Sequence, residues 1–301
     1  MNPIKAIYVD WHLPRKNSGI LMPSKRSWEI CMLIRSVYFS RKYNNLSPVL
    51  YCDPETYSYY ESIGLLKHFD EVKPILPTST IFDASIFWAA GKFYAILDCD
   101  SPFILIDLDA EIRFKIDYGD CDVYCTHLER VVDTDLKFYP KVEYLDAKNY
   151  IGNNFNIEWG SSSCNTCLLA FRDLDFAREY ANSAIKFMEC LDEIDPSFSK
   201  VSYIVLIEQR FLYELCRARG KKIGVLISGN YVPTNYALGL PAFENSNLSE
   251  VAGRGFFHVW GFKNDIKKSK EKEDEFFESL SSSVADLKET IIESVSMNYK
   301  L

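Results

Sequence analysis

Two carboxylates one residue apart follow an apolar run at residues 103–106, in the order Phe-Ile-Leu-Ile-Asp-Leu-Asp. Four β-forming residues in a row predict a buried strand. Side chains at positions i and i+2 of a strand share a face, so we expect Asp107 and Asp109 to converge where this strand leaves the sheet. Two adjacent negative charges are costly to bury unless a cation or a proton compensates them, and hard divalent cations are the usual compensation. The pair therefore predicts a metal and phosphate site; the alternative is a polar strand-end turn.

The segments around this pair alternate between strand and helix patterns. In the first half of the chain we expect strands at residues 4–9, 48–52, 72–76 and 103–107, and helices at 27–43, 54–66 and 84–97. This alternation predicts an α/β fold with a mostly parallel central sheet flanked by helices. Ligands of such sheets bind at the carboxyl ends of the strands, where Asp107 and Asp109 would lie.

The second half of the chain is less regular. Strands are expected at residues 121–126, 163–171 and 223–227, and helices at 174–191 and 203–219. The connection at 129–160 is long, which is typical of a lid or substrate wall. Apolar residues from Phe276 to Val295 recur at spacings of three and four, which predicts one long amphipathic helix. We therefore expect a main domain at 1–264 and a C-terminal helical extension at 265–301, which packs on that domain or on a partner.

Composition excludes several classes of protein. The chain has 301 residues, of which 48% are hydrophobic, so it is expected to fold rather than to be disordered. Its net charge of −8 argues against a nucleic-acid partner. The amino terminus has no signal-peptide pattern, and no apolar run approaches the roughly 18 residues of a membrane helix. We expect a cytoplasmic protein without a transmembrane segment.

Nine cysteines are present, and without a secretion signal they are read as reduced thiols. Two close pairs, Cys121 with Cys125 and Cys164 with Cys167, raise the alternative of a zinc site. Both pairs lie in expected strands, where a spacing of three puts the two side chains on opposite faces. Buried free thiols are therefore the favoured interpretation.

Five segments occur in an order that resembles the GT-A-fold (nucleotide-diphospho-sugar transferase) glycosyltransferases. The resemblance is to the retaining group that contains glycogenin and the bacterial lipopolysaccharide galactosyltransferases, and to an uncharacterised bacterial branch of it. It spans residues 4–264 in motif order. The segments that carry it are 91–97 (GKFYAIL), 107–109 (DLD), 164–169 (CNTCLL), 207–212 (IEQRFL) and 258–263 (HVWGFK).

The resemblance implies a metal site. In the family the Asp-x-Asp pair binds a divalent metal that grips the diphosphate of a nucleotide sugar. The resemblance assigns Asp107, Asp109 and His258 as metal ligands, with Mn²⁺ as the expected ion and Mg²⁺ as the alternative. Oxygen ligands with one imidazole suit manganese. His258 and Gly261 match the family's late His-x-x-Gly-x-x-Lys motif, whereas Lys263, assigned to the phosphates, comes one residue early.

The resemblance also assigns donor contacts outside the metal site. Asp10 and Trp11 lie where the family holds the nucleotide base. Lys92 is assigned to the phosphates, along with Asp107 through the metal. Asn165 matches an asparagine that lines the sugar pocket.

Glu208 and Gln209 match an acidic-Gln pair at the floor of the family's site. In retaining transfer by front-face attack the leaving phosphate takes the acceptor's proton, so no separate base is needed. The resemblance therefore gives Gln209 a positioning role near the anomeric carbon. Glu208 would hydrogen-bond donor-sugar hydroxyls or the acceptor.

Each of these residues has a structural alternative. His12, His68 and His127 have no motif context and are read as structural only. The alternatives are a solvated helix residue for Lys92, a strand-kink partner for Asn165, core packing for Trp11, a first-turn helix charge for Glu208 and a buried structural histidine for His258.

The function implied is that of a metal-dependent glycosyltransferase. It would move a hexose from a nucleotide sugar, with UDP-hexose expected, to a glycan, polysaccharide or lipid-linked saccharide acceptor with retention. Peripheral association with the inner membrane face is left open. The main alternative is a catalytically inactive GT-A-fold protein that binds a sugar nucleotide or a glycan. A haloacid dehalogenase-type phosphatase is disfavoured, because its Asp-x-Asp motif lies on the first strand and Glu111 stands where it has Thr or Val.

Overall fold

The computed structural model describes residues 4–130, 154–155, 157, 159–160, 162–191, 194–195, 198–227, 230–231, 255–259 and 263–299. Within these, the strands are β1 (Lys5–Asp10), β2 (Ser47–Cys52), β3 (Glu71–Lys73), β4 (Phe103–Ile106), β5 (Ala110–Ile112), β6 (Val123–Arg130), β7 (Ser162–Phe171), β8 (Ile223–Val225), β9 (Asn230–Tyr231) and β10 (Phe256–His258). The α-helices are α1 (Leu13–Asn17), α2 (Ser27–Asn44), α3 (Pro54–Ser62), α4 (Ala90–Asp98), α7 (Leu174–Cys190), α8 (Lys200–Val205), α9 (Phe211–Ala218), α11 (Lys263–Ile266), α12 (Lys270–Ser282) and α13 (Lys288–Asn298).

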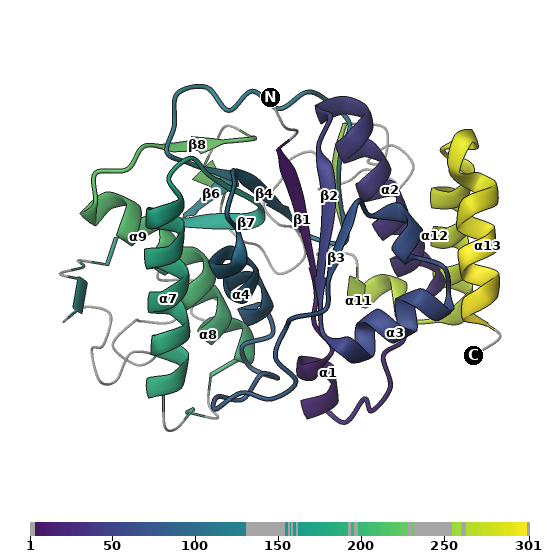
Figure 1. Cartoon of the computed structure of the whole chain (residues 1–301), viewed down its shortest axis with the longest axis horizontal. Helices are drawn as coiled ribbons and strands as arrows, with labels where there is room; N and C mark the ends of the chain where they lie inside the picture. The colour runs from purple at the N-terminus through teal and green to yellow at the C-terminus, as the bar shows by residue number, and fades with distance from the viewer. Residues whose placement is uncertain are drawn as a thin grey trace.

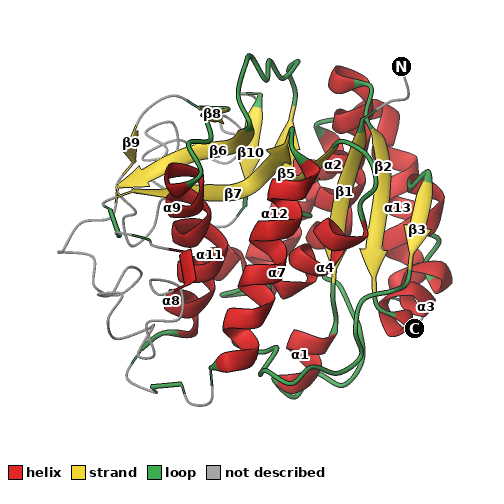
Figure 2. Ribbon diagram, turned by 60° about the vertical axis from the view of Figure 1, so that its left-hand side comes forward, coloured by secondary structure: helices red, strands yellow, loops and turns green. Residues whose placement is uncertain are grey.

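The central sheet has the strand order β3-β2-β1-β4-β7-β6-β8, with β9 paired to β6. β7 runs antiparallel to both of its neighbours, β4 and β6, and the other pairs in this sheet are parallel. A separate two-stranded ribbon joins β5 and β10 (Figure 2). The expected α/β fold with a mostly parallel central sheet is confirmed.

Helices cover both faces of the central sheet (Figure 1). On one side α4, α7, α8 and α9 pack over a core that includes Ile7, Phe93 and Phe211. On the other side α2, α12 and α13 cover a second core that includes Tyr8 and Ile34. Ile7 and Tyr8 are adjacent on β1 and belong to different cores, as the alternation of side chains along a strand requires.

The C-terminal extension differs from its prediction. The expected single helix is two helices, α12 and α13, separated by extended backbone at Val284 and a 3₁₀ turn at Ala285–Leu287. The end of α12 is held by the buried guanidinium of Arg35 on α2, whose Nη1 donates to the Leu280 carbonyl oxygen at 2.6 Å and to Ser283 Oγ at 2.7 Å. The prediction of one helix was wrong because periodicity alone does not reveal this capping. The division into 1–264 and 265–301 stays a prediction.

Three other helical segments depart from the expected bounds, and the helix expected at 54–66 ends at Ser62. The helix expected at 84–97 begins at Ala90, because Asp83 holds a preceding turn by accepting from the Ser85 backbone N–H at 2.8 Å. The helix expected at 203–219 contains a π-helical turn at Leu206–Arg210 between α8 and α9. Such turns frequently mark functional positions.

His68, in the 3₁₀ turn Leu66–His68, supplies a pH-dependent contribution to stability. Burial, with Lys67 and Arg41 nearby, lowers the pKa of His68 from 6.5 to about 4. The unfolded chain therefore binds a proton that the folded chain rejects, so stability falls as the pH drops from 6.5 towards 4. We expect urea unfolding to show about 2–3 kcal/mol more acid destabilisation over this window in the natural chain than in His68→Phe. Parallel pH profiles for the two proteins would refute this assignment.

Candidate functional site

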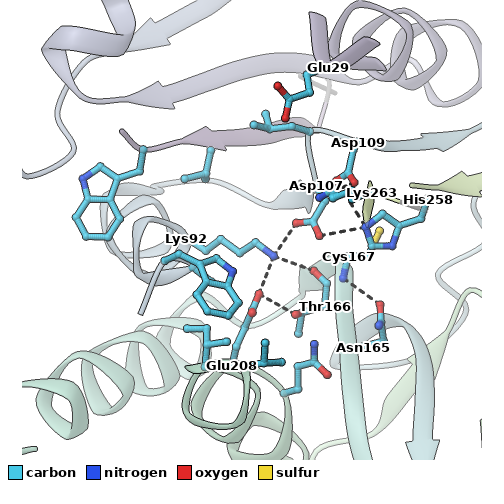
Figure 3. Close-up of a pocket in the computed structure, with 18 of the residues that line it drawn as sticks. Glu29, Lys92, Asp107, Asp109, Asn165, Thr166, Cys167, Glu208, His258 and Lys263 are labelled. Carbon is cyan, nitrogen blue, oxygen red and sulfur yellow. Dashed lines mark hydrogen bonds and ion pairs between the residues drawn. The ribbon is translucent and has the colours of Figure 1, made fainter. Parts of the chain in front are cut away.

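A cavity of about 330 Å³ opens at the carboxyl ends of β1 and β4. Its walls come from β1, α2, α4, β7, the π-helical turn, β10 and α11 (Figure 3). Nine of the ten residues assigned from the sequence line it, and only Asp10 does not. The lining residues from that set are Trp11, Lys92, Asp107, Asp109, Asn165, Glu208, Gln209, His258 and Lys263.

Asp107 and Asp109 lie in the tight turn that links β4 to β5. The Ala110 backbone N–H donates to the Asp107 carbonyl oxygen at 3.1 Å, and the Asp107 N–H donates to the Cys167 carbonyl oxygen on β7 at 2.8 Å. The second bond anchors the turn to the central sheet. The two carboxylates therefore converge as expected, although they do so across a turn rather than along an extended strand.

His258 brings an imidazole to both carboxylates. β10 pairs with β5 so that His258 lies opposite Ala110, directly after Asp109. Its Nε2 atom lies 3.8 Å from Asp107 Oδ2 and 3.6 Å from Asp109 Oδ1. The side chain is 6% exposed, and these separations are too long for hydrogen bonds. Trp260 and Gly261 of the same motif lie outside the described residues.

Two lysines neutralise the carboxylates. Lys263 Nζ lies 2.8 Å from Asp109 Oδ2, so the shortened spacing of its motif still lets it reach the site. Burial acts to raise the pKa of the Asp109 carboxyl, but Lys263 and His258 outweigh it and hold that pKa below its usual range. The negative charge of Asp109 is therefore favoured by its surroundings.

Lys92 lies between the Asp pair and the floor of the cavity. Its Nζ atom lies 2.7 Å from Asp107 Oδ1 and 2.6 Å from Glu208 Oε1 (Figure 3). Burial acts to lower the pKa of the Lys92 ammonium, but the two carboxylates more than offset it and raise that pKa. Gly91 makes this placement possible, because a Cβ atom there would lie 2.9 Å from Val9 Cγ1 on β1. The reading of Lys92 as a solvated helix residue does not describe this side chain.

Glu208 and Gln209 are presented by the π-helical turn. Glu208 is 7% exposed, and its Oε1 also accepts from Thr166 Oγ1 at 2.8 Å. The Tyr180 hydroxyl donates to the Glu208 carbonyl oxygen at 2.6 Å, which fixes the turn from the α7 side. Glu208 is thus part of a buried polar network rather than a solvated first-turn charge, and Gln209 lies on the same floor.

Asn165 lines the cavity and also satisfies the sheet. Its Nδ2 donates to Glu129 Oε1 at 2.9 Å, and its Oδ1 accepts from the Cys167 backbone N–H at 3.2 Å. The pairing of β6 with β7 shifts register between Cys125 and His127, close to these contacts. Asn165 therefore does both: it satisfies backbone at the strand irregularity and it lines the cavity.

Asp10 is held in an ionic cluster next to the cavity. Its carboxylate accepts from the Tyr60 hydroxyl at 2.5 Å and lies 3.0 Å from Lys25 Nζ. Burial acts to raise the pKa of Asp10, but Lys25 and Arg15 outweigh it and lower that pKa. Trp11 is 5% exposed, donates to the Pro77 carbonyl oxygen at 2.7 Å, and presents part of its ring to the cavity.

Cys167 is a site residue that the sequence interpretation did not assign. Its sulfur and the ligand atoms of Asp107 and His258 lie within 4.8 Å of one another. Strand periodicity was the available signal, since Cys167 is two residues after Asn165. Thr166 was missed as well, and Lys25 and Glu29 on the α2 side carried no motif that could have found them.

The cysteines are free thiols in the described part of the chain, as expected. Cys164 and Cys167 belong to different cores, one on each face of the sheet. Burial, with Asp107 and Asp109 nearby, raises the pKa of the Cys167 thiol well above its usual value.

The donor atoms suit a divalent cation. A carboxylate oxygen of Asp107, the His258 imidazole and the Cys167 thiol lie within 4.8 Å of one another. Lys92 and Lys263 pair with the carboxylates of Asp107 and Asp109. A buried carboxylate needs a cation beside it, and either a lysine or a metal ion can fill that role. An anionic ligand that pairs with the lysine would therefore leave the carboxylate free to bind a metal.

The model of a family of unknown function, DUF6734, matches residues 80–294, and the chain belongs to that family. No match is found among curated protein sequences. Three solved structures share part of its architecture. The apo bifunctional glycosyltransferase WbbM is 10% identical, with a TM-score of 0.42, over 97% of this chain and 51% of its own, so the chain spans about half the length of WbbM. The galactosyltransferase LgtC, solved with donor and acceptor sugar analogs, is 14% identical, with a TM-score of 0.40, over 95% of this chain and 99% of its own. Mouse xyloside xylosyltransferase 1 in its apo form is 9% identical, with a TM-score of 0.40, over 75% of this chain and 85% of its own.

Proposed function

We propose that this protein is a metal-dependent glycosyltransferase of the GT-A type. It transfers a hexose from a nucleotide sugar, with UDP-hexose as the expected donor, to a glycan, polysaccharide or lipid-linked saccharide. The observation that carries the proposal is the convergence of Asp107, Asp109 and His258 at the strand ends, with Lys92 and Lys263 beside them. Two carboxylates, an imidazole and two ammonium groups in one cavity suit a metal-bound diphosphate.

The residues divide the work by position. A divalent metal bound by Asp107, Asp109 and His258 would stabilise the negative charge that develops on the leaving diphosphate. Manganese is the ion implied by the motif resemblance. Lys92 and Lys263 lie where their ammonium groups can turn from the carboxylates to the phosphate oxygens.

The floor of the cavity would orient the sugar. Glu208 is fixed by Thr166 and Lys92, so its second oxygen can accept from a sugar or acceptor hydroxyl. Gln209, on the same π-helical turn, would position the acceptor near the anomeric carbon. Transfer with retention follows from the resemblance, with the leaving phosphate receiving the acceptor's proton.

The acceptor determines where the protein works. The described part of the chain contains no helix that is both long and apolar enough to cross a bilayer. We propose a cytoplasmic enzyme that meets its acceptor at the inner membrane face, where polysaccharides are assembled on lipid carriers.

The direct test incubates the protein with a panel of nucleotide sugars in the presence of manganese, magnesium, zinc or a chelator. Chromatography then measures the nucleoside diphosphate that is released. We expect one donor to be cleaved only when a divalent metal is present. NMR of the transferred sugar then gives the anomeric configuration. Binding of a donor without any turnover, across the acceptor classes named above, would favour the inactive binding protein instead.

A further inference from the structure

The sulfur of Cys167 lies where the apolar core on the α2 side of the sheet meets the charged groups of the cavity. The residue is 3% exposed, and its surroundings include Asp107, Asp109, Lys92 and Lys263. Figure 3 shows the sulfur beside the His258 ring, within 4.8 Å of the ligand atoms of His258 and Asp107. Apolar packing accounts for one side of this thiol, and the approach of its sulfur to two other candidate ligand atoms requires a further explanation.

The backbone fixes the thiol relative to the Asp pair. The Asp107 N–H donates to the Cys167 carbonyl oxygen at 2.8 Å, directly where β4 ends beside β7. Cys167 also donates its own N–H to Asn165 Oδ1. The three candidate donors thus come from three rigid strand positions: the end of β4, β7 and β10.

The spacing of the His258 imidazole supports shared coordination. Two ligand atoms that each lie about 2.1 Å from one ion, at a tetrahedral angle, are about 3.4 Å apart. His258 Nε2 lies 3.8 Å from Asp107 Oδ2 and 3.6 Å from Asp109 Oδ1, close to that spacing and beyond hydrogen-bond length. The imidazole is buried and directed at the same point as the thiol.

We propose that Cys167 is a metal ligand and that this site selects a thiophilic ion such as zinc or cobalt over manganese or magnesium. Thiolate and imidazole ligands favour zinc, whereas magnesium and manganese favour oxygen ligands. As the S–metal bond forms, the Cys167 S–H proton passes to solvent. Cys167 would join Asp107, Asp109 and His258 around the ion, and a further position would remain for a phosphate oxygen. The inference rests on the proposed metal site and names the ion that it takes.

Cobalt titration of the metal-free full-length chain tests this directly, because a thiolate bound to Co²⁺ gives a near-ultraviolet charge-transfer band. The variants are Cys167→Ser and, as a matched control, Cys164→Ser, a buried thiol on the same strand in the opposite core. We expect the band in the natural chain and in Cys164→Ser but not in Cys167→Ser. We also expect Cys167→Ser to lose zinc affinity by at least about tenfold while its manganese affinity changes less.

Cobalt binding without the band, equal zinc affinity in Cys167→Ser, or no metal binding at all would overturn the proposal. If Cys167→Ser fails to fold, cadmium NMR of the natural chain reports a sulfur ligand without any substitution. The outcome is separable from the proposed function. A thiolate band without nucleotide-sugar binding would refute the transferase and keep the metal assignment, and manganese-dependent donor binding without the band would do the reverse.

Discussion

Asp109→Asn is expected to abolish metal-dependent binding of the nucleotide sugar while leaving the fold intact. The substitution keeps the side-chain shape but removes the charge that faces His258 and Lys263. A metal-stabilised diphosphate accounts for several kcal/mol of binding and transition-state stabilisation, so donor affinity in the presence of metal should fall by at least about a hundredfold. Isothermal titration with the cognate donor, with and without metal, measures this loss.

The control for that experiment is Asp120→Asn. Asp120 is an exposed aspartate that pairs with Arg172 at 2.8 Å and does not line the cavity. The Asp120→Asn protein should bind the donor with the affinity of the natural chain. If Asp109→Asn retains metal-dependent binding, the Asp pair is only a strand-end turn and the site assignment is wrong.

Arg35→Met is expected to destabilise the protein by about 3–5 kcal/mol, because it removes the fully buried counterion of Glu111 and leaves this carboxylate with only the partly exposed Arg113. Arg35 and Glu111 are both fully buried, with Nε donating to Oε1 at 2.5 Å and Nη2 to Oε2 at 3.1 Å. The same guanidinium caps α12 through Leu280. Glu111 follows Asp109 by two residues, so the Arg35–Glu111 pair also connects the turn at residues 107–109 to the C-terminal helices. Urea unfolding gives the free-energy change.

Two further variants sharpen the measurement. Arg41→Met removes an ion pair with Asp70 from the exposed side of the same helix and should cost less than about 1 kcal/mol. The double variant Arg35→Met/Glu111→Leu should recover much of the loss, since the buried carboxylate is gone and the remaining Arg113 is partly exposed. An Arg35→Met protein as stable as Arg41→Met would show that the buried pair does not contribute the expected stability.

Local pattern was sufficient for the main architecture. Alternation of strands and helices predicted the mostly parallel sheet, and the apolar run at 103–106 placed Asp107 and Asp109 at a strand end. The helix expected at 27–43 matches α2 at Ser27–Asn44 within one residue. These features depend on neighbours in the sequence, where periodicity is a direct signal.

Features that depend on contacts between residues far apart in the chain could not be predicted from the sequence. Arg35 reads as one more polar residue in a helix, and only the fold brings it to Glu111 and Leu280. The π-helical turn that presents Glu208 has no periodic signature. The place of Cys167 depends on β7 lying antiparallel beside the end of β4, which a single sequence does not specify.

The most direct test of the account is calorimetric titration of the natural chain with UDP, GDP and their hexose conjugates, each with and without manganese or zinc. The account predicts that one nucleotide sugar binds only when a divalent metal is present. That result would also identify the nucleotide base of the donor. A folded protein that binds none of them under any of these conditions would contradict the assignment of a donor site at Asp107, Asp109 and His258.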